Sequence, residues 1–324
     1  MSMSGRHLIA IKSETDHGVD AFVGSLPTEW LGIIGQPEIQ ETTQEIGPEE
    51  MTADGLGGQI LRVPEKTALS FTTYLVGKAD AAGDPPPGLD VLFKASNCAE
   101  TISAASSAAY QVAFGRSMTD VPSMTVYEAT RDDVSGDYYV RAITGVRGTW
   151  KVMFTDGKDV RLSFEGVGQY AEKSTVLETI SAPTEYSGGK NRLKCQSIAY
   201  TYAGDAFGIT EIELGTGMTI DEDHDLSATA SVDQVGLYLA EASKPGGSTT
   251  FKSGEWTRLW PLVKPAPGPQ DSGEVKITVT DGTDTVELVG IDTVIGAYSK
   301  TLAGGNYEHT TPLTCLGGLT VTFT

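Results

Sequence analysis

The segment Ile143–Ala171 reads ITGVRGTWKVMFTDGKDVRLSFEGVGQYA and decides the fold class of this chain. Two runs of alternating apolar and polar residues, Thr149–Thr155 and Lys158–Gly166, are joined by Asp156-Gly157. Asp-Gly accepts the positive φ angles of a type I′ turn, so the pattern predicts a β-hairpin. We expect one face to be buried and the other to be exposed. The inward set is Trp150, Val152, Phe154, Val160, Leu162 and Phe164.

Strand patterns continue on both sides of this hairpin. A second hairpin is predicted where Val275, Ile277 and Val279 run up to Asp281-Gly282 and the chain returns through Val286 and Leu288. Further strands are expected, each bounded by turn residues; they are Ser123–Thr130, Asp137–Thr144, Lys194–Tyr202, Ile209–Leu214 and Leu319–Phe323. The chain is therefore predicted to be mainly β.

Helical spacing is confined to two short stretches. Gly88–Thr101 follows three prolines and places apolar residues on one stripe, which predicts a helix flanking the sheet. Gly254–Leu262 is a weaker helix candidate, with Trp256, Leu259 and Trp260 at i, i+3, i+4 spacing. We expect these aromatic residues to belong to the core.

One segment has the composition of a long exposed loop. Gly47–Gly58, GPEEMTADGLGG, lies between the extended runs Pro37–Ile46 and Gln59–Val76, so we expect it at the tip of a long hairpin. Lys264–Asp271 is the most linker-like stretch, but few residues follow it. We therefore predict a single domain, 1–324, with a surface crossing there.

The charge balance argues against a protein that grips nucleic acid. Of the 324 residues, 43 are Asp or Glu and 23 are Lys or Arg, a formal net charge of −20. Such a surface suits a wall along which DNA slides without adhering, and it equally suits simple solubility. No signal-peptide core or bilayer-length apolar window occurs, so we expect a soluble protein without a membrane.

The motifs of common catalytic and metal sites are missing. No phosphate-binding loop, HExxH or GxSxG pattern occurs, and the four histidines are expected to be solvated. Asp221–Asp225 has alternate carboxylates, but Leu226 and Val232 stand where a calcium loop needs Gly and Glu, so an acidic turn is expected. Cys98, Cys195 and Cys315 show no CxxC spacing and are expected to be reduced. We predict no catalytic residue, no cofactor and no metal, and no enzymatic activity.

As a whole the chain resembles the major tail tube proteins of siphophages, the long-tailed bacterial viruses. The resemblance is carried by the order of several segments, the most specific of which is Ile143–Ala171. The others are KSETDHGVDA (Lys12–Ala21), LDVLFKASNCAETI (Leu89–Ile102), SMTVYEATRDD (Ser123–Asp133), LKCQSIAYTYAG (Leu193–Gly204) and EIELGTGMTIDEDHDL (Glu211–Leu226). Residues 1–262 match best; 263–324 match loosely as C-terminal hairpins, and a small decoration domain there is an alternative.

The resemblance implies a β-sandwich or barrel-forming tail tube fold that assembles as a hexameric ring with a shared inner β-barrel. Stacked rings would form a conduit in the virion tail, built in the host cytoplasm, through which DNA passes without specific binding. Partners would be the chain itself, the tape measure protein, the tail terminator, and distal tail or baseplate proteins. The implied inter-ring loop is Gly47–Gly58, with candidate residues Gly47, Pro48, Glu49, Glu50, Met51, Asp54 and Gly57.

Two alternatives from other classes share the strand content and the acidity. A carbohydrate-binding or glycan-degrading β-sandwich would use tryptophans as stacking platforms, and the candidates are Trp30, Trp150, Trp256 and Trp260. The alternating apolar context of Trp150 favours a core position instead. A capsid-decorating protein of the virion would lack the barrel hairpins and the loop that forms the polymer.

Overall fold

The computed structural model shows a mainly β chain in which strands far outnumber helices, as predicted. It describes residues 7–46, 61–77, 88–102, 110–114, 121–169, 171, 173–180, 184–185, 192–195, 197–217, 220–224, 235–239, 244–263, 271–280, 284–303 and 306–324. Within these residues no helix has the length and apolar character needed to cross a membrane.

The elements of the first half are β1 (His7–Ser13), β2 (Glu29–Trp30), β3 (Glu38–Ile46), β4 (Leu61–Tyr74), α1 (Leu89–Lys94), β5 (Cys98–Ile102), β6 (Tyr110–Phe114), β7 (Met124–Arg131), β8 (Tyr138–Thr155) and β9 (Arg161–Gln169). Those of the second half are β10 (Leu177–Glu178), β11 (Thr184–Glu185), β12 (Ser197–Tyr202), β13 (Asp205–Phe207), β14 (Ile209–Gly215), β15 (Ile220–His224), β16 (Val235–Leu239), β17 (Gly246–Phe251), a 3-10 turn (Ser253–Glu255), α2 (Trp256–Val263), β18 (Gly273–Thr280), β19 (Thr285–Ile295), β20 (Ser299–Ala303) and β21 (Asn306–Phe323).

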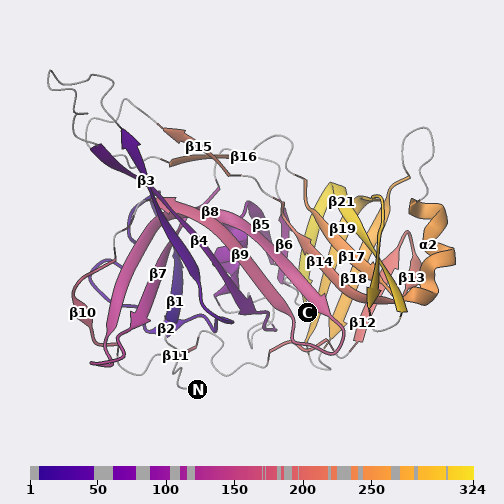
Figure 1. Ribbon diagram of the computed structural model, residues 1–324, viewed down its shortest axis with the longest axis horizontal. Coiled ribbons are helices and arrows are strands. Elements are labelled where there is room, and N and C mark those ends of the chain that lie inside the picture. Colours follow the sequence, from indigo (N-terminus) through magenta and orange to yellow (C-terminus); the bar gives the residue numbers. More distant parts are fainter. Residues whose placement is uncertain are drawn as a thin grey trace.

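Strand β8 joins the two sides of the molecule. In Figure 1 the N-terminal strands lie on the left and the C-terminal strands on the right, and β8 runs between them. Its first part pairs with β7, from Arg131↔Tyr138 to Met124↔Val146. Its second part pairs with β9 and β14, so the partners change between Val146 and Arg147. The two strands predicted at Asp137–Thr144 and Thr149–Thr155 are thus one continuous strand.

The hairpin predicted around Asp156-Gly157 is confirmed as β8 and β9, but its predicted turn type is wrong. Trp150 lies opposite Phe164 and Val152 opposite Leu162, and all four side chains are buried. The Lys158 amide donates to the Thr155 carbonyl oxygen at 3.0 Å across the turn. A type I′ turn requires positive φ at both central residues. Gly157 has φ +73°, but Asp156 is not among the described non-glycine residues with positive φ.

Tertiary hydrogen bonds explain this difference. The Asp156 amide donates to the Thr210 carbonyl oxygen at 3.1 Å, and the Gly157 amide donates to that of Cys195 at 3.3 Å. The turn is therefore bonded to two distant segments, which no local pattern can anticipate. The second hairpin is confirmed by the pairing of Val279 with Val286, and its Asp281-Gly282 turn lies outside the described residues.

The helix predicted over Gly88–Thr101 is too long. Helix α1 ends at Lys94, and Asn97 adopts φ +58°, a left-handed conformation that asparagine tolerates and that cannot continue a helix. The chain then enters β5, which pairs with β6. The predicted apolar stripe is nevertheless correct, because Leu89, Leu92 and Phe93 are buried. The second predicted helix is present as α2.

Three further expectations are corrected. The acidic segment at Asp221 is not a turn, since Ile220–His224 forms β15 and pairs with β16; Asp225 lies outside the described residues. His309 is only 5% exposed rather than solvated, and Trp260, expected in the core, is 40% exposed. Both residues belong to a surface considered below.

The main hydrophobic core extends across both sides of β8. It is one contiguous cluster that contains Ile9 near the N-terminus and Phe323 near the C-terminus. Trp150 lies inside it, packs edge-on against Phe93 at 5.3 Å between ring centroids, and donates to the Cys98 sulfur at 3.4 Å. Each such large side chain contributes about 1.5–3 kcal/mol through burial. A second cluster, which includes Leu8 and Trp30, covers the opposite face of β1 and β7.

The bend of β8 begins at a β-bulge. Thr125 of β7 lies between the pairs Met124↔Val146 and Val126↔Ile143, so one residue faces two, Thr144 and Gly145. Gly145 has φ +66°, the left-handed conformation that such a bulge requires. A bulge leaves a backbone amide without a partner in the ladder, and a buried amide of this kind needs another acceptor.

Glu14 supplies that acceptor. Its Oε1 accepts hydrogen bonds from the Gly145 amide at 2.8 Å and from the Thr125 hydroxyl at 2.9 Å. Its Oε2 accepts from the Gly18 amide at 2.8 Å and from the Ser123 hydroxyl at 2.6 Å. One carboxylate therefore bonds the segment Lys12–Ala21 to the bulge of β8.

Two paired glycines allow the strands to cross closely after the bulge. Gly148 lies opposite Gly166, and the ring of Phe164 covers both positions. A Cβ atom on Gly148 would clash with the Glu165 carbonyl oxygen and with Phe164 Cζ. Any side chain at this position would push β8 and β9 apart.

We predict that Gly148→Ala lowers the free energy of unfolding by about 3 kcal/mol, because the added methyl group meets a backbone atom that cannot move away freely. The control is Gly254→Ala, where nothing lies within 4 Å of the added atom and φ is not left-handed. Urea unfolding of both variants measures the difference. Equal stabilities would show that close crossing at Gly148 is unimportant.

We predict that Glu14→Gln lowers the free energy of unfolding by about 2–3 kcal/mol, because its amide nitrogen cannot accept hydrogen bonds from two donors. Glu29→Gln is the control, because it makes the same chemical change at an exposed position. Thermal and urea unfolding give the comparison. A Glu14 variant as stable as the Glu29 variant would contradict the role given to this carboxylate.

Candidate functional site: the β3–β4 ribbon and its polar root

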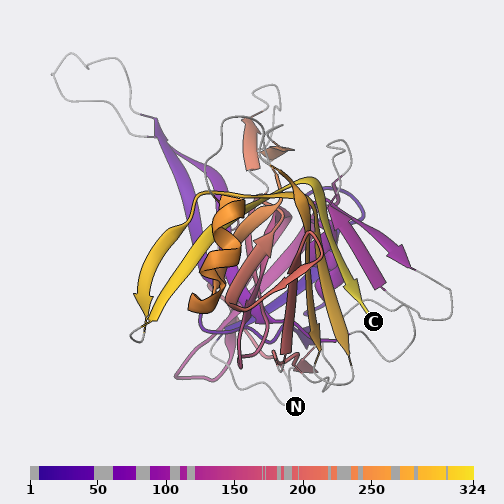
Figure 2. The same ribbon diagram turned by 90° about the vertical axis from the view of Figure 1, so that its right-hand side faces the viewer.

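Strands β3 and β4 form a ribbon that extends past the sheet behind them. They pair from Glu38↔Ser70 to Ile46↔Leu61. The pairing of β4 with β9 stops at Lys66↔Gln169. From Thr43↔Pro64 to Ile46↔Leu61, the ribbon therefore consists of two strands alone among the part of the chain that the structure describes. Figure 2 shows it projecting to the upper left, away from the body.

The sequence of β4 fits this arrangement. Pro64 has no amide hydrogen and is tolerated in a sheet where a strand is bonded on one side only. It lies two residues beyond the last pairing with β9, in the two-stranded part of the ribbon. A register shift between Thr42 and Thr43 lies at the same level. The ribbon thus leaves the body where the third strand ends.

The long outer edge of β3 is a second feature of this site. Among the described strands, β3 pairs with β4 only. Its residues Glu38, Gln40 and Glu41 are exposed. An unpaired edge of nine residues is a template for pairing with another chain, and its carboxylates discourage unselective pairing.

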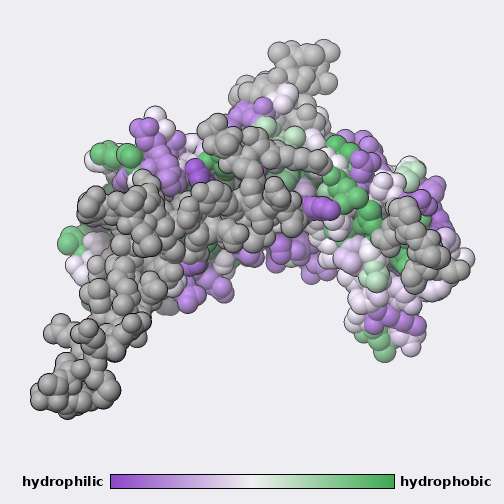
Figure 3. Space-filling model, turned by 90° about the horizontal axis from the view of Figure 1, so that it is seen from above, coloured by the Kyte–Doolittle hydropathy of each residue, from purple (hydrophilic) through white to green (hydrophobic). Residues whose placement is uncertain are grey.

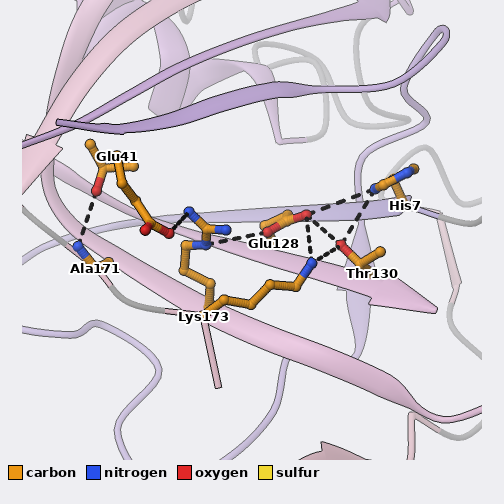
Figure 4. A network of polar contacts seen from close by, with 8 residues as sticks. His7, Glu41, Glu128, Thr130, Ala171 and Lys173 are labelled. Carbon is orange, nitrogen blue, oxygen red and sulfur yellow. Dashed lines mark hydrogen bonds and ion pairs between the residues drawn. The ribbon is translucent and has the colours of Figure 1, made fainter. Parts of the chain in front are cut away.

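A network of charges fixes the base of the ribbon to the body. Arg141 of β8 forms an ion pair with Glu41 of β3, with Nη1 and Oε1 2.6 Å apart. Its Nε lies 3.4 Å from Oε2 of Glu128 on β7. Lys173 lies 3.9 Å from Glu128 Oε1 and donates to the Thr130 hydroxyl at 2.8 Å (Figure 4). We call these five residues the polar root.

The polar root is balanced in charge, and its two central side chains are shielded from water. Glu128 and Arg141 have side chains that are 6% and 9% exposed. Two carboxylates, Glu41 and Glu128, face two cations, Arg141 and Lys173. The Thr130 hydroxyl donates to Glu128, and His7 Nδ1 approaches that carboxylate at 3.8 Å. Removing one partner would leave a buried charge uncompensated.

The sequence-predicted site residues belong to the chain segment that connects β3 to β4. Gly47, Pro48, Glu49, Glu50, Met51, Asp54 and Gly57 are all in the segment between Ile46 and Leu61, outside the described residues. The flanking runs are paired as expected. The sequence analysis did not predict the polar root, although the burial of Glu128 could have been predicted. Glu128 alternates in step with Met124 and Val126 in a predicted strand, so its side chain lies on their buried face.

A hollow lies elsewhere among the described residues. It has a volume of about 470 Å³ and lies between β1, the segment before β2, and α1. Its walls combine Ile11, Phe22 and Val91 with Lys12 and Asp90. Among the described residues, no three His, Cys, Asp or Glu side chains gather as a metal site would require.

We predict that Arg141→Met lowers the free energy of unfolding by about 3–5 kcal/mol, because Glu128 then remains buried without its main cation. Arg131→Met, at an exposed position of β7, is the matched control. Adding Glu128→Gln to Arg141→Met should restore part of the loss. Urea unfolding measures all three, and equal stabilities of the two single variants would contradict this role of the root.

The sequence matches no known protein-family model, and no curated protein matches it either. The geometry of the ribbon, its unpaired edge and its polar root is therefore what supports a function.

Proposed function

We propose that this protein is the structural subunit of a viral tail tube, which assembles into hollow rings that stack as a conduit for DNA. The observation that carries the proposal is the β3–β4 ribbon, two-stranded beyond Lys66↔Gln169. An isolated two-stranded ribbon is marginally stable in water. Pairing with a neighbouring copy would supply the missing strand and remove the exposed edge.

The polar root supports the same role. A strand that transmits contacts between subunits must be held at a fixed angle to the body of its own subunit. Arg141 links Glu41 on the ribbon to the buried Glu128 in the body. These ion pairs fix the ribbon near the point where it leaves the sheet, so its direction is defined before assembly.

The barrel, the ring and the partners belong to the proposal as the resemblance implies them. In each ring, strands of a hexamer would build a shared inner β-barrel, and Gly47–Gly58 would contact the next ring. The tape measure protein, the tail terminator and the distal tail proteins would be the other partners in the virion. With a formal net charge of −20, the chain can supply a bore that repels phosphate.

The glycan-binding alternative has fewer candidate platforms than its sequence suggested. Trp30 and Trp150 are 0% and 1% exposed and cannot stack on a sugar. That alternative therefore depends on Trp256 and Trp260 alone. The third candidate, a capsid-decorating protein, gives no reason for a projecting ribbon with an unpaired edge.

We predict that the purified protein forms rings or hollow tubes at high concentration in negative-stain electron microscopy. The triple variant Glu49→Gln, Glu50→Gln, Asp54→Asn should still form rings but stack poorly, because these residues are the proposed inter-ring contacts. The matched control is Glu178→Gln, Asp205→Asn, Glu274→Gln, which removes the same charge at exposed positions elsewhere.

Two outcomes would count against the proposal. Persistent monomers at high concentration would argue against a tube subunit, and the same tubes from both triple variants would remove the contact role of the loop. A three-dimensional reconstruction of the tubes tests the bore directly. We expect acidic residues to outnumber basic ones there, and a neutral or basic bore would contradict the electrostatic part.

A further inference from the structure

The hairpin of β20 and β21 carries aromatic and apolar side chains on one exposed face. Lys300 lies opposite His309 and Leu302 opposite Tyr307, so these four side chains share a face. Leu302 is 63% and Tyr307 is 51% exposed. The other face carries Ser299, Thr301, Glu308 and Thr310. The hairpin thus has the alternation of a half-buried strand pair, with its apolar side uncovered.

This face continues onto helix α2 through ring contacts. Trp256 stacks on His309, with centroids 4.3 Å apart and planes at 18°, and lies 4.6 Å from Tyr298 and 5.2 Å from Trp260. Trp260 and Tyr298 are 40% and 36% exposed. The aromatic face consists of Trp256, Trp260, Tyr298, Leu302, Tyr307 and His309.

The aromatic face is the uncovered extension of the core. Along β21 the buried residues Leu313 and Cys315 have the same parity as Tyr307 and His309. Pairing of β21 with β17 ends at His309↔Phe251, so the outer part of the hairpin is two-stranded among the described residues. Figure 3 shows this projection at the lower right, with hydrophobic residues at its tip. The face of β21 that is buried in the core at Leu313 and Cys315 is exposed to solvent at Tyr307.

The chemistry of the face is that of a protein interface. Trp, Tyr and large apolar side chains are the residues that anchor interfaces between proteins. Burial and the nearby Lys300 hold the pKa of His309 below its ordinary value, and its Nδ1 has no hydrogen-bond partner among the described residues. The neutral form of the ring is therefore favoured, and this form suits the stack on Trp256.

We propose that the aromatic face binds a second copy of this chain, at a surface where carboxylates meet Lys300. This inference rests on the proposed function, because a ring or tube subunit always has copies of itself as neighbours. Lys300 is exposed and lies over the Tyr307 ring at 3.7 Å, in the middle of the face. Carboxylates are the commoner charged groups on a second copy, which has 43 acidic residues against 23 basic ones, so a local contact with this cation is favourable.

The direction of the hairpin agrees with this partner. In Figure 2 the β20–β21 hairpin and the β3–β4 ribbon both project to the left of the body. Glu38 of β3, on the ribbon, has an exposed carboxylate. Two arms that project on one side of each subunit can contact the same neighbouring copy.

The test compares Leu302→Asp with Ser299→Asp, which adds the same charge to the opposite face of the same hairpin, across from Thr310. Sedimentation velocity over a range of concentrations measures association, and electron microscopy shows whether the products are hollow. We expect Leu302→Asp to weaken association by roughly tenfold or more and Ser299→Asp to leave it near wild type. Circular dichroism confirms that both variants fold.

Tryptophan fluorescence reports on the face itself. Trp30 and Trp150 are fully buried, so acrylamide quenching comes mainly from Trp260 and from the partly exposed Trp256. Quenching of the wild type should fall as the protein concentration rises, whereas Leu302→Asp should remain quenched. Protection by glucose or N-acetylglucosamine oligosaccharides without any dependence on protein concentration would make the face a sugar platform and overturn the inference.

The remaining outcomes separate the inference from the proposed function. Hollow tubes from Leu302→Asp that match the wild type would overturn the inference and leave the tube function intact. Wild-type oligomers that are not hollow, and that Leu302→Asp abolishes, would support the inference and reject the tube. A wild type that stays monomeric at every concentration would overturn both.

Discussion

The carboxylate of Glu14 at the β8 bulge is the contact on which the rest of the structure depends. Strand β8 can pair with β7 in its first part and with β9 and β14 in its second part only because the bulge at Gly145 redirects it. Glu14 accepts the amide of the bulged residue and at the same time anchors the N-terminal segment. Beyond the bulge, Gly148 and Gly166 let the crossing strands approach each other. A polar contact thereby sets the course of a strand whose inward face is almost wholly apolar.

The same bent strand connects the core with the projecting ribbon. Arg141 lies on β8 before the bulge and reaches Glu41 on β3, while Trp150 lies after the bulge in the main core. A buried ion pair adds little net stability compared with apolar packing, because both charges must leave water. The ion pair instead fixes the position of β3 relative to β7 and β8. The ribbon leaves the body from a fixed base, as assembly through its outer strands would need.

Two surfaces of the monomer remain without partners in the part of the chain that the structure describes. One is the edge of β3, which offers backbone groups and carboxylates. The other is the aromatic face, which offers apolar area around Lys300. They differ in chemistry and could complement each other between copies. In a protein that works as a monomer, unpaired strand edges and exposed apolar faces promote aggregation. In a protein that forms a polymer, the same surfaces form the contacts between subunits.

Local alternation by itself determined the hairpin of β8 and β9, the inward set around Trp150, the pairing of Val279 with Val286, and the ribbon flanking Gly47–Gly58. These features depend on neighbours close in the chain, so period-two patterns and turn residues reveal them. The turn at Asp156 was mistaken because Thr210 and Cys195 bond to it from elsewhere. The end of α1 at Asn97, the burial of Glu128 with Arg141, and the exposure of Trp260 were decided by the tertiary structure. Each of them depends on which distant strand lies alongside, and that information exists only once the sheet has formed.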